Sequence, residues 1–232
     1  MTRARYLIPI IDSLDLDANP RSSKTGPVTD AIQESIENDP SVLPFKTKGI
    51  LLASSHYERL ERGRIKLTPE NPQIEGILDG GHNTLAIGLY ILKKAMEHKG
   101  TAFPKGAKTW DDFKELWQAN RNFVDEFLNA LQKDPSIGDL NFYVPVELLV
   151  PCDTDDICVV EFFKNNLLEI CASRNNNVEL QVSAKVNQLG YFTDLQELMR
   201  THNSALCDRM NGNPMTAGIL KCRILLHLHG FL

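Results

Sequence analysis

The N-terminal part of the chain lacks a long apolar run. Its stretch "RYLIPIIDS" is interrupted by Pro9 and Asp12, which leaves it too short for a membrane-spanning helix or for the apolar region of a secretory signal. This absence argues against an anchored or exported protein. We therefore expect a cytoplasmic protein with no membrane partner.

An excess of positive charge is also missing. The chain has 25 lysines and arginines against 30 aspartates and glutamates, which gives a formal net charge of -5 and a pI near 5.7. No overall basic field favours nonspecific binding of nucleic acid. Any such binding would need a local patch.

Cysteines are few, odd in number, and without a CxxC pair. This pattern favours neither a disulfide framework nor a zinc site, so we expect reduced thiols, most of them in the core. The five cysteines are Cys152, Cys158, Cys171, Cys207 and Cys222.

Apolar residues are abundant enough for one substantial core. Hydrophobic residues make up 42% and charged residues 24% of the 232 positions, which is typical of a globular protein with room for a second helical layer. We interpret residues 1–150 as a mixed domain and residues 151–232 as a helical extension. Whether a longer polypeptide continues that extension stays open.

In several segments the spacing of apolar residues indicates a helix or a strand. "PVTDAIQESIEND" begins with proline and repeats apolar residues every four positions, which predicts a helix. Residues 50–53 predict a buried strand, and "ERLERGRIKLT" predicts a hairpin. We also expect strands in "RYLIPIIDSL" and "LNFYVPVELLV". One long amphipathic helix, capped by Thr109, is expected in "TWDDFKELWQANRNFVDEFLNALQK", with its aromatic stripe in the core.

The stretch "EGILDGGHNTLAIGLYIL" joins an expected strand, "IEGIL", to an expected buried helix over residues 84–97. The first N–H groups of such a helix have no partner within it, so its start is suited to an anion. Gly80 and Gly81 permit positive φ and close approach of a ligand to the backbone. The turn therefore favours a phosphate-bearing ligand.

Four polar residues complete this candidate site. His82 can donate to a phosphate oxygen, and Asn83 or Thr84 can cap the helix while offering another donor. Asp79 can bind a divalent cation, act as a base, or hold the turn by accepting backbone N–H bonds. A purely structural turn without a ligand is an equally good interpretation.

Four short motifs occur in a distinctive order. The first is "NPR" with Asn19 and Arg21, and the second is "KGI" with Lys48. The third is "DGGH" with Asp79 and His82, and the fourth is the "RN" segment of "SRNNNVELQVS", with Arg174, Asn175 and Asn176. In this order they resemble the AIPR group of abortive-infection and phage-resistance proteins. The glycine turn also resembles the Asp-Gly-Gln-His-Arg motif of DGQHR proteins, and "NPR" followed by Ser35 and Ile36 resembles ParB.

This resemblance implies an α/β (α+β) fold of the ParB/sulfiredoxin-like type. Such a fold has a mixed small sheet with helices, here followed by an α-helical C-terminal part. Asn83 departs from the pattern, because ParB and DGQHR proteins have an arginine there that can clamp a phosphate. Arg21, Lys48 or Arg174 is then expected to supply the charge. The turn also lacks the cysteine of sulfiredoxin, which excludes the sulfinic-acid reductase reaction.

The resemblance further implies a role in bacterial defence against phage. We expect a nucleoside triphosphate, ATP or CTP, with its phosphates on the amides of residues 80–84 and on His82. Arg21 and Lys48 would close the opposite side, and Asp79 would position Mg²⁺ or a water. Binding is the firmer expectation, and hydrolysis stays open.

Two other functions fit the same residues. The pocket could hold the backbone of DNA or RNA, with Asp79 and His82 activating a metal-bound water in a nuclease. The domain could instead be a non-catalytic interaction module. A homodimer is open in each case.

Three further groups of residues are best interpreted without a catalytic or metal-binding role. Ser54, Ser55 and His56 lack a triad partner in the sequence, so we expect ordinary surface. "DTDD" at residues 153–156 is most simply an acidic helix start. The histidines of "HLH" fall on different faces of an expected helix and do not suit a metal.

Overall fold

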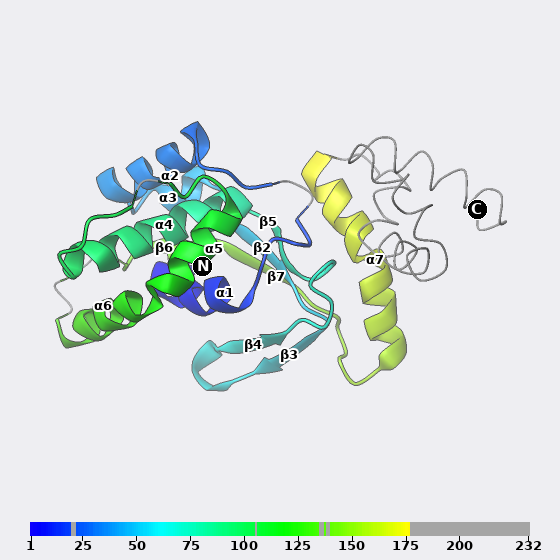
Figure 1. The fold of residues 1–232 in the computed structure, drawn as a ribbon. Helices are drawn as coiled ribbons and strands as arrows, with labels where there is room; N and C mark the ends of the chain where they lie inside the picture. Colours follow the sequence, from blue (N-terminus) through cyan, green and yellow to red (C-terminus); the bar gives the residue numbers. More distant parts are fainter. Residues whose placement is uncertain (20–21, 105, 135–136, 138–139, 177–232) are drawn as a thin grey trace, which may run out of the picture. The chain divides into compact units, whose positions relative to one another are not determined.

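The computed structural model describes residues 1–19, 22–104, 106–134, 137 and 140–176 (Figure 1). The chain divides into two compact units, Met1–Lys164 and Asn165–Leu232. The first unit mixes helices with small sheets, so it has the α+β fold expected from the sequence. Within the described part of the chain, no helix combines the length and apolarity that crossing a membrane requires.

A three-stranded sheet lies at the centre of this unit. Its order is β5 (Gly76–Asp79), β2 (Ile50–Ala53) and β7 (Val146–Leu149), with β2 antiparallel to β5 and parallel to β7. All four residues of β2 are buried, which explains its continuous apolar run. The predicted strand at residues 50–53 is therefore confirmed.

The central helix is α4 (Gly81–His98), and it is buried along most of its length. It packs against α2 (Pro27–Asn38), α5 (Trp110–Ala119) and α6 (Arg121–Lys133). Figure 1 shows α4 between α2 on one side and α6 on the other. This burial confirms the helix predicted from "TLAIGLYIL".

The N-terminal segment differs from the expected strand. After the short strand β1 (Thr2–Arg3), the chain forms a 3₁₀ turn, η1 (Ala4–Leu7), and a short helix, α1 (Ile8–Ser13). Its buried residues recur at the spacing of a helix, not of a strand. They are Ala4, Leu7, Ile8 and Ile11.

The expected long amphipathic helix is two helices. Asn120 leaves the helical conformation, with φ -119° and ψ 17°, and separates α5 from α6. Thr109 caps α5 as predicted, because its side chain accepts from the N–H of Asp112 at 3.2 Å. The aromatic stripe is core, since Trp110, Phe113 and Phe127 are buried.

A hairpin follows β2 in the chain. It consists of β3 (His56–Arg59) and β4 (Ile65–Thr68), joined by the 3₁₀ turn η2 (Glu61–Gly63). Figure 1 shows it extending from the sheet, away from α2, α3 (Leu43–Lys46) and α4. The predicted hairpin is confirmed.

The remaining described elements are β6 and α7. Strand β6 (Tyr143–Val144) pairs with β1, and the predicted strand "LNFYVPVELLV" is thus divided between β6 and β7. Helix α7 (Ile157–Asn176) provides the described part of the expected helical extension. Cys152 and Cys158 are exposed and Cys171 is buried, all as free thiols, so the expectation of mostly buried cysteines fails for two of these three.

Candidate anion-binding site

The glycine turn places the end of β5 directly against the start of α4. Gly80 adopts the left-handed conformation, with φ 82° and ψ 22°, and α4 begins at the next residue. The Oδ1 atom of Asp79 accepts a hydrogen bond from the N–H of Gly80 at 2.7 Å. Asp79 therefore holds the turn, which is one of the three roles expected for it.

The two glycines are required for different reasons. A Cβ on Gly80 would lie 2.2 Å from the backbone oxygen of Gly49. A Cβ on Gly81 would lie 2.2 Å from the Oγ of Ser23. Positive φ occurs at Gly80 and not at Gly81, so Gly81 serves the close approach of the loop before α2.

The start of α4 offers donors that the described protein groups leave unused. No described residue accepts from the N–H groups of Gly81, His82 and Asn83, and Gly80 has no side chain to cap the helix. Three aligned N–H groups at the positive end of an 18-residue helix favour an anion.

Ser23 adds a hydroxyl to these donors. Its side chain is buried, with 3% exposed, and its Oγ has no hydrogen-bond partner among the residues that the structure describes. The backbone around it is fixed, because its carbonyl accepts from the N–H of Trp110 at 3.2 Å and Lys24 bridges to Thr109. A buried hydroxyl without a partner costs free energy, and a ligand oxygen at the start of α4 would remove that cost.

Two predicted ligand side chains have partners within the protein. The Nδ2 of Asn83 donates to the backbone oxygen of Gly49 at 2.7 Å. The hydroxyl of Thr84 donates to the backbone oxygen of Gly80 at 3.0 Å, and Thr84 is fully buried. Asn83 thus ties the loop before β2 to the turn and keeps its backbone N–H for a ligand. Thr84 offers neither group, because its backbone N–H also donates to the backbone oxygen of Gly80, at 2.9 Å.

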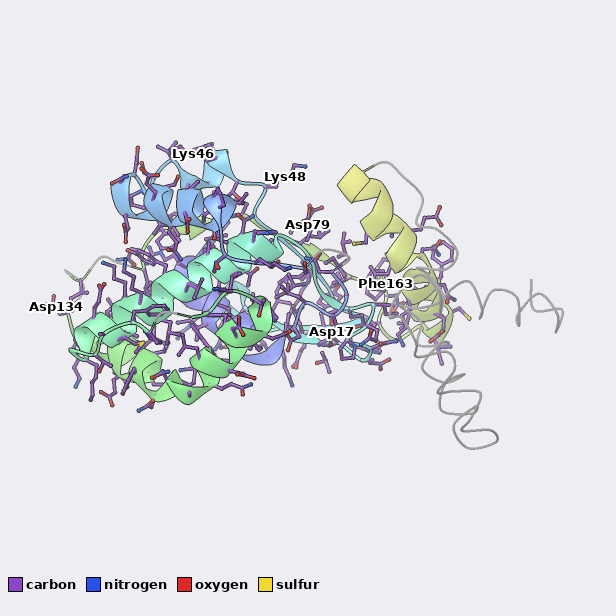
Figure 2. All side chains as sticks on the ribbon, turned by 45° about the horizontal axis from the view of Figure 1, so that its top comes forward. Asp17, Lys46, Lys48, Asp79, Asp134 and Phe163 are labelled. Carbon is purple, nitrogen blue, oxygen red and sulfur yellow. The ribbon has the colours of Figure 1, made fainter. Side chains whose placement is uncertain are left out.

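Two cationic or ionisable side chains lie near the turn. Lys48 is exposed and precedes Gly49, which contacts Gly80. Figure 2 shows Lys48 and Asp79 at the same end of the sheet. His82 is half-buried and makes no hydrogen bond with a residue that the structure describes.

The other predicted site residues are placed in part. The amide nitrogen of Asn19 lies 3.1 Å from the position that a Cβ of Gly81 would occupy, so the "NPR" loop does approach the turn. Arg21 lies outside the described residues. Arg174, Asn175 and Asn176 form the last turn of α7, and their side chains also lie outside the described part.

A second polar cluster was missed by sequence reasoning. Ser54 and Ser55 are fully buried, so the expectation of ordinary surface was wrong for them. Glu75, which is 1% exposed, provides a buried partner for Ser55. Its Oε2 accepts from the N–H of Ser55 at 2.8 Å and from the hydroxyl of Ser55 at 3.0 Å. Partners separated by twenty residues leave no local pattern in the sequence.

This cluster does not have the geometry of a nucleophilic triad. The Nδ1 of His56 lies 3.2 Å from the Ser55 hydroxyl and 3.3 Å from Oε1 of Glu70, so one ring nitrogen faces both groups. A triad uses the two ring nitrogens separately. Glu70 also accepts from Lys164 at 2.5 Å, and this bond raises the pKa of Lys164 above its ordinary value. The cluster joins the base of the hairpin to the first half of α7.

Metal ligands are sparse near the turn. Within the described ranges, no group of three or more histidine, cysteine, aspartate or glutamate side chains could hold a metal ion. Asp79 alone would have to share a cation with ligand oxygens. Mg²⁺ tolerates that arrangement, because it commonly combines one or two carboxylates with phosphate oxygens and water.

Comparison with known proteins adds no assignment. No protein-family model matches the chain, and neither a curated protein nor a solved structure matches it.

Proposed function

We propose that the first unit binds a nucleoside triphosphate, ATP or CTP, with its phosphates at the start of α4. The phosphate oxygens accept from the N–H groups of Gly81, His82 and Asn83. Ser23 and the ring of His82 donate to the same group, and Lys48 supplies positive charge. Mg²⁺, where bound, is shared between Asp79 and the phosphates.

The observation that carries this proposal is the buried hydroxyl of Ser23. It lacks a partner among the described residues, and it lies 2.2 Å from the position that a Cβ of Gly81, the first residue of the 18-residue helix α4, would occupy. A helix start alone is a common feature, but a second donor buried without a partner beside it is not. The Ser23 hydroxyl and the N–H groups at the start of α4 can donate to the same anion.

The biological role follows from the order of the motifs in the sequence. We place the chain beside the AIPR and DGQHR proteins, with a ParB/sulfiredoxin-like domain, and propose a cytoplasmic role in phage defence. Binding without hydrolysis is the simpler activity here, because Oδ1 of Asp79 accepts from the N–H of Gly80 and the other oxygen is the one that the proposal gives to Mg²⁺. A general base must reach the attacking water.

The first test is thermal unfolding of the full chain with ATP, CTP, GTP, UTP or inorganic triphosphate, each with and without Mg²⁺. A ligand that binds the folded state at about 100 times its Kd raises the free energy of unfolding by about 2.7 kcal/mol. We expect a rise in Tm that Ser23→Ala and His82→Ala reduce.

Ser22→Ala is the matched control, because Ser22 is the exposed neighbour of Ser23. Its Tm shift with ligand should equal that of the unmodified protein. A shift with triphosphate alone would assign the site to the phosphates and not to the base. Absence of a shift with every ligand would refute the proposal, and an equal shift in Ser23→Ala would place the ligand elsewhere.

A further inference from the structure

The β3–β4 hairpin concentrates positive charge on a chain whose net charge is -5. Every residue from 58 to 66 is exposed. Two acids, Glu58 and Glu61, lie among four basic residues. These are Arg59, Arg62, Arg64 and Lys66.

The four cationic groups have no carboxylate partner within ion-pair distance among the described residues. Lys66 lies opposite Glu58 in the strand register, yet the two form no ion pair. The Nε–H of Arg64 donates to the backbone oxygen of Glu61 at 3.2 Å, which orders the turn without neutralising the charge. The positive charge therefore remains available to a polyanion.

The backbone at the tip gives a second indication. Arg62 has φ 61° and ψ 34°, and it is the one residue other than glycine with positive φ in the described ranges. Glycine or asparagine adopts this conformation at lower cost. An arginine kept in a strained conformation at an exposed tip points to a use for its side chain.

We propose that the hairpin docks into the major groove of double-stranded DNA. A two-stranded ribbon fits the groove of B-form DNA, which is about 12 Å wide, whereas the deep and narrow major groove of duplex RNA does not admit it. Arginine and lysine side chains on the ribbon neutralise phosphates and release counterions.

The hairpin lies at the opposite end of β2 from the glycine turn. Leu51 pairs with Asp79, whereas Ala53, which leads to the hairpin, pairs with Gly76. DNA docking on the hairpin therefore uses different residues from the nucleotide site, and it stands whether or not that site binds nucleotide.

The test measures binding of the full chain to a labelled 20-base-pair DNA duplex by fluorescence anisotropy at several salt concentrations. The variant combines Arg62→Gly, Arg64→Gln and Lys66→Gln. We expect Kd to rise about tenfold or more at low salt, and the slope of log K against log salt to fall by about 0.9 for each phosphate contact removed. Circular dichroism checks that the variant folds, and glycine at position 62 suits the backbone.

Two controls accompany the variant. Glu61→Gln removes an acid from the same tip and should tighten binding, whereas Lys133→Gln removes an exposed charge from α6 and should leave Kd unchanged. A duplex RNA of the same sequence should bind at least several-fold more weakly. The proposal fails if the unmodified protein does not bind DNA at low salt, if the folded triple variant binds equally well, or if the RNA duplex binds as tightly as DNA.

Discussion

Gly80 is under two constraints, a left-handed backbone and a neighbouring carbonyl. Its φ is 82°, and a Cβ would meet the backbone oxygen of Gly49 at 2.2 Å. The left-handed conformation costs a residue with a Cβ about 1–2 kcal/mol, and overpacking adds about 1–3 kcal/mol. We expect Gly80→Ala to lower the free energy of unfolding, measured in urea, by the sum of both.

Gly100→Ala separates the two costs. Gly100 also has positive φ, 73°, but a Cβ there meets nothing within 4 Å. Its substitution should cost about 1–2 kcal/mol, from the backbone alone. Equal losses in the two variants would show that the contact with Gly49 is unimportant.

Ser23→Ala should change stability and binding in opposite directions. Removing a buried hydroxyl that lacks a partner removes a desolvation cost, so the free protein should gain about 1 kcal/mol. Ligand binding should weaken at the same time. Unfolding in urea with and without triphosphate measures both, and a loss of stability in the free variant would contradict the account of Ser23 given above.

The structure of the candidate site was predictable from the sequence where the pattern was local. The turn of Asp79, Gly80 and His82 stood out because a strand, two glycines and a helix follow one another directly. Ser23 did not, since "RSSKTGP" is an ordinary polar loop until Gly81, far along the chain, packs against it. The basic residues of the hairpin could be read from the sequence, but their exposure to solvent depends on the fold.

At the level of elements, the contact between α4 and α5 depends on a missing side chain. A Cβ on Gly88 would lie 2.4 Å from the Cζ of Phe113, which is fully buried. Glycine to alanine in a helix normally gains about 1 kcal/mol. Here we expect Gly88→Ala to lower the free energy of unfolding by about 1–3 kcal/mol, because the buried Phe113 ring cannot move aside without strain.

A second variant tests the cause of that loss. Phe113→Leu shortens the side chain that faces Gly88, so Gly88→Ala should cost less in that background. The four free energies of unfolding form a double-mutant cycle with a coupling of about 0.5–3 kcal/mol. Additive losses would rule out the contact as the cause.

The start of α5 should show a dependence on pH. The backbone N–H groups of Thr109 and Lys108 donate to the Asp112 carboxylate and lower its pKa below the ordinary 3.8. Such a carboxylate stabilises the folded state above its unfolded pKa, and the contribution disappears as pH falls through the folded pKa. Asp112→Asn should therefore lower Tm at pH 7, and the difference should shrink as the pH falls below 3.8 and through the folded pKa. Measuring Tm from pH 7 to pH 2.5 checks this.

The N-terminal segment shows how an element can be misassigned. "RYLIPIIDSL" suggested a strand because it is rich in isoleucine. Its buried residues Ala4, Leu7, Ile8 and Ile11 nevertheless follow the three-and-four spacing of a helix. Proline at the start of α1 is compatible with that helix, since its missing N–H would have no partner there.

At the level of the whole molecule, the main hydrophobic core of the described residues lies in the first unit. Its main cluster of buried residues extends from Ala4 to Val144, and the first unit ends at Lys164. We expect a protein truncated after Asn176 to unfold in one cooperative transition with nearly the same Tm as the full chain. Calorimetry tests this, and loss of the transition would show that the later residues are needed for folding.

The composition and periodicity predicted the α+β class because most elements carry their own period. They could not predict that one long helix breaks at Asn120, since the amphipathic pattern continues through it on both sides. The pairing of β2 with β7 was also beyond local reasoning. Those strands are far apart in the chain and meet through burial of their apolar faces.

Strand β2 limits where the chain can change its length. Its four residues are buried and the strand is paired on both sides, so inserting or removing one residue would turn the later side chains of the strand to the wrong face. The exposed turn at Gly63 has no such limit, because a Cβ there meets nothing within 4 Å. A peptide epitope could therefore be inserted after Gly63. An immobilised antibody against that epitope would then hold the protein on a solid support while the start of α4 stays accessible to ligands.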